Sequence, residues 1–430
     1  MKAFLFLTAI LLIPLPLHAA DGAGGIELSD CHLSMPGSSR RIPARCGTLE
    51  VPENREAPDG RKIALRVAVL EALSRNPKPD PLFFLAGGPG QAASEAYIGV
   101  ASAFRRLQKR RDIVLVDQRG TGGSNRLDCK SSEEEPSIEI ETNPEKLRAW
   151  AMKCRDALSE KADLTRYTTT IAMQDLDAVR QALGYERINL YGISYGTRAA
   201  LTYIKNFPEH VRTAVLDGVV PQDEALGISA ARDAQRALSL LFERCDDDET
   251  CRTHFPELRR SFDDLLARFE GGAVPVELDH PITAKRISFP YTREAFAWMI
   301  RMGSYADTSL AILPLLLHHS HETGDFRRIA AQSLMLDESL AHMMAMGMSY
   351  SVTCSEDWPM IDRETAERIN EGSYMGMMLI DALDTVCASW PRGKVPPDFK
   401  EPVHATMPVL LLSGEADPVT PPENAEEVAR

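Results

Sequence analysis

Three features are scarce in this sequence of 430 residues: Cys-x-x-Cys pairs, long apolar runs and an excess of positive charge. No Cys-x-x-Cys pair occurs, which argues against a structural zinc site. After residue 20 no apolar run is long enough to span a bilayer, so we expect no membrane partner. The net charge of −14 argues against nucleic-acid binding. We also expect no metal and no cofactor.

The first 20 residues have the pattern of a secretory signal peptide. Lys2 supplies the positive start, residues 3–17 are apolar, and small residues end at Ala20. Leu17 and His18 stand where a small residue is usual, which leaves the cleavage point open. The mature chain is therefore expected to be exported, either to a periplasm or out of the cell.

Eight cysteines follow the signal, and an even number in an exported chain indicates disulfides. Consecutive cysteines bracket local segments, which favours pairing between neighbours, although other connectivities are possible. A closed loop of about 15 residues would stabilise the fold by about 3 kcal/mol in the chain-entropy model. The predicted pairs are Cys31–Cys46, Cys129–Cys154, Cys245–Cys251 and Cys354–Cys387.

Short apolar runs bounded by turn residues alternate with helical patterns, which predicts an α/β fold with a mostly parallel sheet. After about residue 224 helix formers and methionine dominate, and nine of the sixteen methionines lie between Met335 and Met378. We read this part as a helical cap inserted into the sheet domain. The expected parts are a signal peptide (1–20), a core (21–223), a cap (224–395) and the end of the core (396–430). The expected strands are 47–51, 63–69, 81–85, 112–116, 187–191, 211–216 and 407–414. The expected helices outside the cap are 94–110, 171–183 and 197–201.

The pentapeptide Gly192-Ile193-Ser194-Tyr195-Gly196 lies between an expected strand and an expected helix. In that context G-x-S-x-G predicts a nucleophile elbow, the sharp turn that presents a serine hydroxyl at the carboxyl end of a sheet. A glycine-rich connection that happens to contain a serine is the alternative. Ser194 is the predicted nucleophile.

A reactive serine also needs oxyanion donors and an acid that orients its base. The glycines of Gly87-Gly88-Pro89-Gly90 follow an expected strand, so the N–H groups of Gly88 and Tyr195 are the predicted donors. Asp417 follows the strand at 407–414 and is the predicted acid, with Glu415 as its local competitor. An ordinary Gly-Pro turn and a solvated aspartate are the structural alternatives.

Four motifs together resemble the α/β-hydrolase peptidases of the proline iminopeptidase and tripeptidyl aminopeptidase family. They are residues 87–90, Asp117–Gly122 with Ser124, residues 192–196, and Gly414–Pro418. Residues 46–52 and 352–357 extend the resemblance to the tripeptidyl branch. It implies a last strand followed by a catalytic histidine, and a serine exopeptidase that releases short peptides or residues from free N-termini. Ala86 departs from the family, whose iminopeptidases usually carry histidine there.

The chain departs from the family more seriously because none of its ten histidines follows Asp417. The family's histidine lies after the next strand, so we expect that this strand and its histidine loop are missing and that the chain is inactive without them. His318, His319 and His321 form the only histidine cluster, and we expect ordinary surface histidines there rather than a metal site.

By the same resemblance, Glu356 and Asp357 are candidates for binding a substrate ammonium group, because a buried charge needs a partner. A solvated loop is the alternative for these two carboxylates. Two alternatives to the peptidase remain open, namely an exported carboxylesterase on the same fold and a catalytically silent binding protein. The oligomeric state is not predicted.

Overall fold

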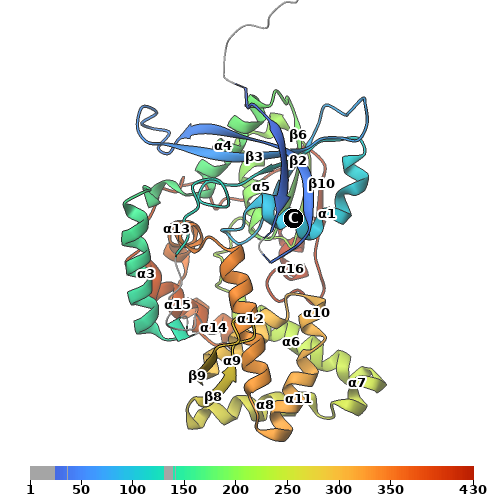
Figure 1. Cartoon of the computed structure of the whole chain (residues 1–430), viewed down its shortest axis with the longest axis vertical. Helices are drawn as coiled ribbons and strands as arrows, with labels where there is room; N and C mark the ends of the chain where they lie inside the picture. Colours follow the sequence, from blue (N-terminus) through green and yellow to red (C-terminus); the bar gives the residue numbers. More distant parts are fainter. Residues whose placement is uncertain (1–24, 36, 130–138, 141) are drawn as a thin grey trace, which may run out of the picture.

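The computed structural model describes residues 25–430 except 36, 130–138 and 141. The predicted signal peptide, residues 1–20, lies outside the described residues. A twisted β-sheet with flanking helices lies at the top of Figure 1, and a mainly helical lobe lies below it. Helix α12 (Arg327–Met343) runs from this lobe towards the sheet.

Within the described residues, one sheet contains eight strands in the order β1-β2-β3-β5-β4-β6-β7-β10. The pairs β1–β2, β2–β3 and β3–β5 are antiparallel. The pairs β5–β4, β4–β6, β6–β7 and β7–β10 are parallel. The mostly parallel sheet predicted from the sequence is therefore confirmed. The strands are β1 (Ser29–Ser34), β2 (Arg41–Pro52), β3 (Lys62–Leu70), β4 (Leu82–Leu85), β5 (Ile113–Val116), β6 (Ile188–Ile193), β7 (Val211–Asp217) and β10 (Val409–Leu412).

Helices cover both faces of this sheet because its central strands are apolar on both sides. In β4 the residues Phe83 and Leu85 join one buried cluster, and Leu82 and Phe84 join the other. This alternation follows from the two-residue period of a strand. The helices before the lobe are α1 (Ala93–Gln108), α3 (Pro144–Ser159), α4 (Thr169–Ala182) and α5 (Tyr195–Asn206), and η1 (Leu164–Arg166) and η2 (Pro208–His210) are single 3₁₀ turns.

The lobe has its own buried core, formed by residues between Ala231 and Met375. The helices after β7 and before β10 are α6 (Ala230–Asp247), α7 (Glu249–His254), α8 (Leu258–Arg268), α9 (Arg293–Gly303), α10 (Asp307–Leu310), α11 (Leu313–Thr323), α12, α13 (Met346–Glu356), α14 (Arg363–Asn370) and α15 (Met378–Cys387). The turns η3 (Phe269–Gly271) and η4 (Trp358–Met360) lie among them, and α16 (Pro422–Ala429) follows β10. A hairpin of β8 (Val274–Asp279) and β9 (Arg286–Tyr291), which the sequence analysis does not predict, also belongs to the lobe.

Not every helix between residues 224 and 395 packs in the lobe. Met348 and Val352 of α13 and Val386 of α15 are buried in the core beneath the sheet. Helix α13 thus carries its residues towards the sheet, while the bounds predicted for the cap remain a prediction.

Four disulfides connect described cysteines, and they join the four pairs that the spacing predicts: Cys31–Cys46, Cys129–Cys154, Cys245–Cys251 and Cys354–Cys387. The last of these ties α13 to α15. Among the described residues, no helix combines the length and the apolar character needed to cross a membrane.

Candidate active site

Ser194 occupies the turn between β6 and α5, where its backbone has φ 55° and ψ −124°. This conformation is costly for a residue with a side chain, and residues held in such strain are often found at active sites. The Ser194 N–H donates to the carbonyl oxygen of Asp217 at 2.9 Å, which ties the turn to the end of β7. The side chain is half-buried.

The flanking glycines are required by close backbone approach. A Cβ on Gly192 would lie 2.3 Å from the carbonyl oxygen of Gly196. A Cβ on Gly196 would lie 2.3 Å from the carbonyl oxygen of Leu85 in the neighbouring strand. Both contacts are far inside van der Waals distance, so the G-x-S-x-G spacing follows from the tight strand–turn–helix geometry.

The loop after β4 lies against this turn. A Cβ on Gly87 would be 3.2 Å from the Ser194 Cβ, and Gly88, with φ 110°, is exposed. Tyr195 is the first residue of α5, so its N–H has no partner within the helix. The structure therefore places the two predicted oxyanion donors on the segments that border the serine.

Asp417 lies in the turn after β10, at the same edge of the sheet as Ser194. Its Oδ1 accepts hydrogen bonds from the N–H groups of Val419 and Thr420, and its Oδ2 accepts one from the Thr420 hydroxyl, each at 2.9 Å. A Cβ on Gly218 would lie 3.8 Å from both the Asp417 Oδ2 and the Ser194 backbone nitrogen. The predicted acid and nucleophile are thus close neighbours across the end of β7.

Arg236 of α6, which the sequence analysis does not single out, holds the turn that contains the acid. Its guanidinium donates to the carbonyl oxygens of Glu415 at 2.7 Å and Asp417 at 2.9 Å. The Glu415 side chain, the competitor for the acid, forms an exposed ion pair with Arg244. Periodicity could not reveal these contacts, because Arg236 and Glu415 lie 179 residues apart in the sequence.

The end of α12 also contacts the predicted oxyanion loop. The Ala345 N–H donates to the Gly90 carbonyl oxygen at 3.0 Å, and Met344 pairs with Gln91 in an isolated β-bridge. Arg126 donates to the carbonyl oxygens of His342 and Met344 at 3.1 and 3.3 Å. Met344, one of the nine methionines between residues 335 and 378, therefore borders the predicted site.

The motif that begins at Asp117 has a structural role in the neighbouring loop. The Asp117 carboxylate accepts hydrogen bonds from the backbone and hydroxyl of Ser94 and from the Gly123 N–H. Arg119 is fully buried and forms a bidentate pair with Asp175 at 2.7 and 2.8 Å. These contacts fix the loop after β5 beside the site.

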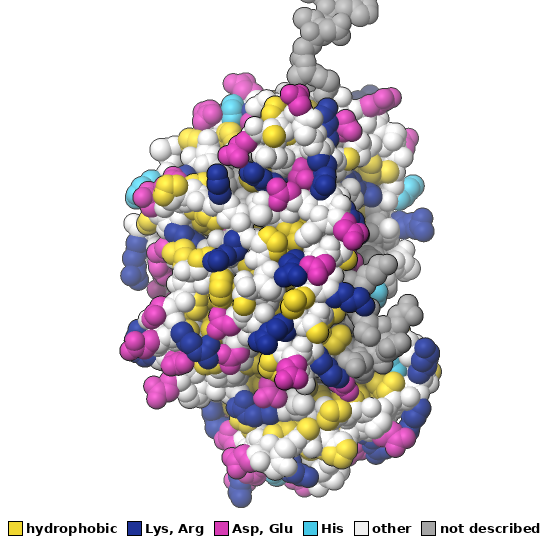
Figure 2. All heavy atoms as spheres, turned by 90° about the vertical axis from the view of Figure 1, so that its left-hand side faces the viewer, with side chains coloured by type: hydrophobic (Ala, Val, Ile, Leu, Met, Phe, Trp, Pro, Cys, Tyr) yellow, Lys and Arg dark blue, Asp and Glu magenta, His cyan; other side chains and the backbone are white. Residues whose placement is uncertain are grey.

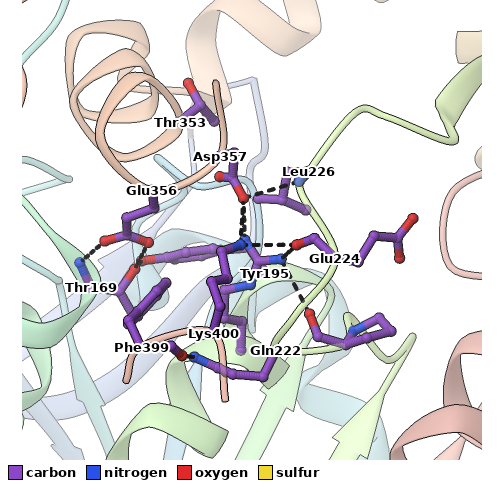
Figure 3. A network of polar contacts seen from close by, with 12 residues as sticks. Thr169, Tyr195, Gln222, Glu224, Leu226, Thr353, Glu356, Asp357, Phe399 and Lys400 are labelled. Atoms are coloured by element: carbon purple, nitrogen blue, oxygen red, sulfur yellow. Dashed lines mark hydrogen bonds and ion pairs between the residues drawn. The ribbon is translucent and has the colours of Figure 1, made fainter. Parts of the chain in front are cut away.

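Glu356 is the last residue of α13 and Asp357 follows it, and both belong to a buried polar network that includes Thr169 and Tyr195 (Figure 3). The Glu356 carboxylate accepts hydrogen bonds from the Thr169 N–H at 2.6 Å and the Thr169 hydroxyl at 2.7 Å. The Thr169 hydroxyl also bonds the Tyr195 hydroxyl at 2.6 Å. One chain of contacts thus links Glu356 to the residue that follows Ser194.

Asp357 has different partners in the same network. Its Oδ1 accepts from Arg198 of α5 at 2.7 Å, from Lys400 at 3.0 Å and from the Leu226 N–H at 3.0 Å. Glu356 is 2% exposed and Asp357 is 0% exposed. Protein groups therefore surround both carboxylates, and their predicted contact with a substrate ammonium group remains a prediction.

The network shifts the proton affinities of its members. Burial, reinforced by the neighbouring Asp357 charge, raises the pKa of Glu356 to about 7 despite its two hydrogen bonds to Thr169. Burial lowers the pKa of Lys400, partly offset by Asp357. Burial and the nearby Glu356 raise the pKa of the Tyr195 phenol, so this hydroxyl stays protonated.

The histidine cluster has ordinary surface contacts. His321 bonds Asp264 at 3.0 Å and Glu322 at 3.3 Å, and His404 is exposed. Within the part of the chain that the structure describes, no three histidine, cysteine or acidic side chains gather as a metal site would require.

Comparisons with known proteins agree with this geometry. Residues 80–246 match the family described as "alpha/beta hydrolase fold", and residues 346–430 match the family described as "TAP-like protein". Serine protease Hip1 of Mycobacterium tuberculosis is 27% identical over 92% of this chain and 80% of its own length. Tripeptidyl aminopeptidase of Streptomyces coelicolor is 25% identical over 95% of this chain and 78% of its own length. Carboxylesterase B of M. tuberculosis is 32% identical, but over 45% of this chain and 39% of its own.

The two family matches occupy the segments that carry the two sides of the site. The first contains the glycine loop and Ser194, and the second contains Glu356, Asp357 and Asp417. With the eight-stranded sheet and the strained turn at Ser194, they identify the chain as an α/β hydrolase of the group that includes the tripeptidyl aminopeptidases.

Proposed function

We propose that this protein is an exported serine exopeptidase, which releases short peptides or single residues from free N-termini through an acyl-enzyme on Ser194. The observation that carries the proposal is the position of Ser194, strained at φ 55° between the glycine loop and Asp417. The relatives named serine protease and tripeptidyl aminopeptidase support peptide substrates. The four disulfides support export, because disulfides persist in oxidising compartments.

In the proposed reaction the Ser194 Oγ attacks the carbonyl carbon of the scissile peptide bond. Negative charge then develops on the carbonyl oxygen, and the N–H groups of Gly88 and Tyr195 donate to it. The Ser194 proton passes through a histidine base to the leaving nitrogen, so collapse of the tetrahedral intermediate releases the shortened peptide as a free amine and leaves an ester on Ser194. Water hydrolyses this ester, which releases the N-terminal fragment and restores the serine.

Asp417 has the role of the acid that orients a histidine. Its Oδ1 accepts two backbone hydrogen bonds within its own turn, so the position of the carboxylate is fixed before any histidine approaches. Arg236 positions this turn from the helical lobe. The chain covers 80% of the length of serine protease Hip1 and 78% of that of tripeptidyl aminopeptidase, and we propose that a histidine outside residues 1–430 serves as the base. Residues 1–430 alone are then expected to hydrolyse substrates inefficiently. Leu410, which is 54% exposed on β10, provides apolar surface against which a segment that carries this histidine could pack.

Selectivity for a free N-terminus requires a negative charge that faces the substrate ammonium group. Glu356 and Asp357 are the candidates. Both oxygens of Glu356 are bonded to Thr169, whereas the Asp357 Oδ2 has no hydrogen-bond partner among the described residues. Met344, which borders Gly88, is proposed to line the apolar part of the substrate site, because methionine adapts to varied side chains.

A carboxylesterase is the second candidate function, because the same serine, acid and oxyanion donors serve ester hydrolysis. Carboxylesterase B, the relative that matches 45% of the chain, favours this alternative. Peptide amides with free or acetylated N-termini, compared with simple esters of the same acyl group, separate the two functions. Loss of hydrolysis upon acetylation supports the exopeptidase, and hydrolysis of the esters alone supports the esterase.

A fluorophosphonate probe tests the serine chemistry directly. We expect labelling of Ser194 in a protein whose coding region is extended past Arg430, no labelling of its Ser194→Ala variant, and little labelling of residues 1–430. Efficient Ser194-dependent labelling of residues 1–430 would show that a histidine within them acts as the base. An extended protein that is folded but unlabelled would instead support the silent binding protein.

A further inference from the structure

A cluster of cations lies where α1 ends. Residues 105–111 have the sequence Arg-Arg-Leu-Gln-Lys-Arg-Arg, and residues 72–79 contain Arg75 and Lys78. Neither segment contains an aspartate or a glutamate, although the whole chain has 62 acidic residues and 48 basic ones. Acidic residues lie at the borders of both segments, but each is bound to another group. Glu71 pairs with Arg45, Asp80 pairs with Arg111, and Asp112 accepts hydrogen bonds from the Ala72 N–H and the Tyr185 hydroxyl. The cations between these borders still need an explanation.

Two backbone hydrogen bonds join the segments into one surface. The Leu73 N–H donates to the Gln108 carbonyl oxygen at 3.0 Å, and the Lys78 N–H donates to the Arg110 carbonyl oxygen at 2.7 Å. The cations of the loop between β3 and β4 therefore lie beside those of the helix end. We call this surface the basic end of α1, formed by Leu73, Arg75, Lys78, Arg105, Arg106, Leu107, Lys109 and Arg110.

The cations of this surface are exposed and available to a partner. Within the described residues none of its six arginines and lysines forms an ion pair, whereas Arg111, at its border, is bound to Asp80. Arg105 and Arg106 lie in the last turn of α1, where the helix dipole favours positive charge, so the presence of these two cations is explained. The helix dipole does not explain the cations of the β3–β4 loop or those after the helix.

Two large apolar side chains lie among these charges. Leu73 is 72% exposed and Leu107 is 40% exposed, and both belong to segments joined by the Leu73–Gln108 bond. A surface that presents leucines within a ring of arginine and lysine fits the interface of a bilayer, where apolar side chains enter the acyl region and cations contact headgroups. A nucleic acid would gain little from the two exposed leucines, so their presence among the cations favours a bilayer.

We propose that the basic end of α1 is a docking surface for a lipid bilayer that carries anionic headgroups. The expectation of no membrane partner rests on the lack of a spanning segment, and this proposal replaces it with peripheral contact. The docking orientation follows from the sheet. Both segments lie at the amino ends of β4 and β5, whereas Ser194 follows the carboxyl end of β6, so a docked molecule presents its candidate site to the aqueous side.

Co-sedimentation with vesicles tests the proposal without any hydrolysis measurement, so its failure is distinct from failure of the proposed function. We expect the mature chain, residues 21–430, to bind vesicles of equal phosphatidylglycerol and phosphatidylcholine, to bind phosphatidylcholine alone much more weakly, and to dissociate as salt increases. The triple variant Arg106→Gln, Lys109→Gln, Arg110→Gln should lower the partition coefficient about a hundredfold, since each cation near an anionic surface contributes roughly fivefold. Leu73→Ser should lower it about fivefold at every salt concentration.

A triple variant on another face provides the matched control. Arg148 and Lys153 of α3 and the nearby Lys161 are exposed cations on the opposite side of the sheet domain from α1 (Figure 1). On the face over α3, acidic and basic side chains are mixed (Figure 2). Arg148→Gln, Lys153→Gln, Lys161→Gln changes the net charge by the same amount and should leave vesicle binding within about twofold, because charge outside the contact surface is screened. Three results would each overturn the proposal: equal loss of binding in this control, no binding to phosphatidylglycerol, or tighter binding to DNA than to vesicles.

Discussion

Arg198 and Asp357 form an ion pair of 2.7 Å in which neither side chain has any solvent exposure. Arg198 belongs to α5, the helix that begins directly after Ser194, and Asp357 follows the last residue of α13. The ion pair therefore joins α5 to the end of α13. The Arg198 guanidinium also donates to the carbonyl oxygens of Pro221 and Glu224, which ties the segment after β7 to the same centre.

Removal of one charge from this pair should be strongly destabilising. Asp357→Asn removes the only carboxylate in direct contact with Arg198 and Lys400 among the described residues, and we expect the free energy of unfolding to fall by about 3–5 kcal/mol in urea titrations. Glu277→Gln is the control, because it breaks an exposed pair with Arg286 and should change this free energy by less than about 1 kcal/mol. Similar small losses in both variants would contradict the structural importance of the buried pair.

Glu356 should make stability depend on pH. Burial raises its pKa to about 7 from an ordinary value of 4.5, so the folded chain binds this proton more tightly than the unfolded chain. Its stabilising contribution is present below pH 4.5 and is lost as the pH rises towards 7. Relative to Glu356→Gln, the wild type should lose on the order of 3 kcal/mol across this window.

Urea titrations at several pH values measure this difference. The neighbouring charges of Asp357, Arg198 and Lys400 are present in both proteins, so the comparison isolates the Glu356 carboxyl group. Glu243→Gln, an exposed substitution on α6, should leave the wild-type pH profile unchanged. Parallel profiles for the wild type and Glu356→Gln would show that the Glu356 proton is not held more tightly in the fold.

Gly196 should not tolerate a side chain. The Cβ of Gly196→Ala would lie 2.3 Å from the Leu85 carbonyl oxygen, so β4 and α5 would have to separate. We expect the free energy of unfolding to fall by about 3 kcal/mol and the melting temperature to fall by several degrees. Gly99→Ala on α1 is the matched control. Its Cβ meets nothing within 4 Å, and replacing a helical glycine should stabilise the protein by about 1 kcal/mol. Equal melting temperatures in the two variants would contradict the described packing.

The sequence is sufficient to predict the parts of the fold that depend on local pattern. The apolar runs at β4 and β5 predict buried strands, and the glycines around Ser194 predict a tight turn, because in each case the cause lies within a few residues. The hairpin β8–β9 is missed although buried and exposed residues alternate along much of both strands. The reason is that it lies in a region dominated by helix formers.

Contacts over long sequence distances are not predictable in this way. Glu356 and Thr169 lie 187 residues apart, and Arg236 and Asp417 lie 181 apart. The sequence around Glu356 is compatible either with a carboxylate that binds substrate or with a solvated loop. Only the packing of α13 beneath the sheet brings the Glu356 side chain to its buried partner, Thr169. The expected changes in stability for the variants described above therefore follow from tertiary contacts and not from sequence motifs.

The strain at Ser194 should be measurable as stability. At φ 55° and ψ −124° a residue with a Cβ is disfavoured, whereas glycine adopts this conformation readily. We expect Ser194→Gly to unfold at a higher urea concentration than Ser194→Ala, with a difference of about 1 kcal/mol after the extra flexibility of unfolded glycine is subtracted. Both variants lose the hydroxyl, so the comparison separates backbone strain from chemistry. The control compares Ser102→Gly with Ser102→Ala within helix α1, where the order should be reversed because the backbone is helical. A Ser194→Gly variant less stable than Ser194→Ala would show that the turn is not strained.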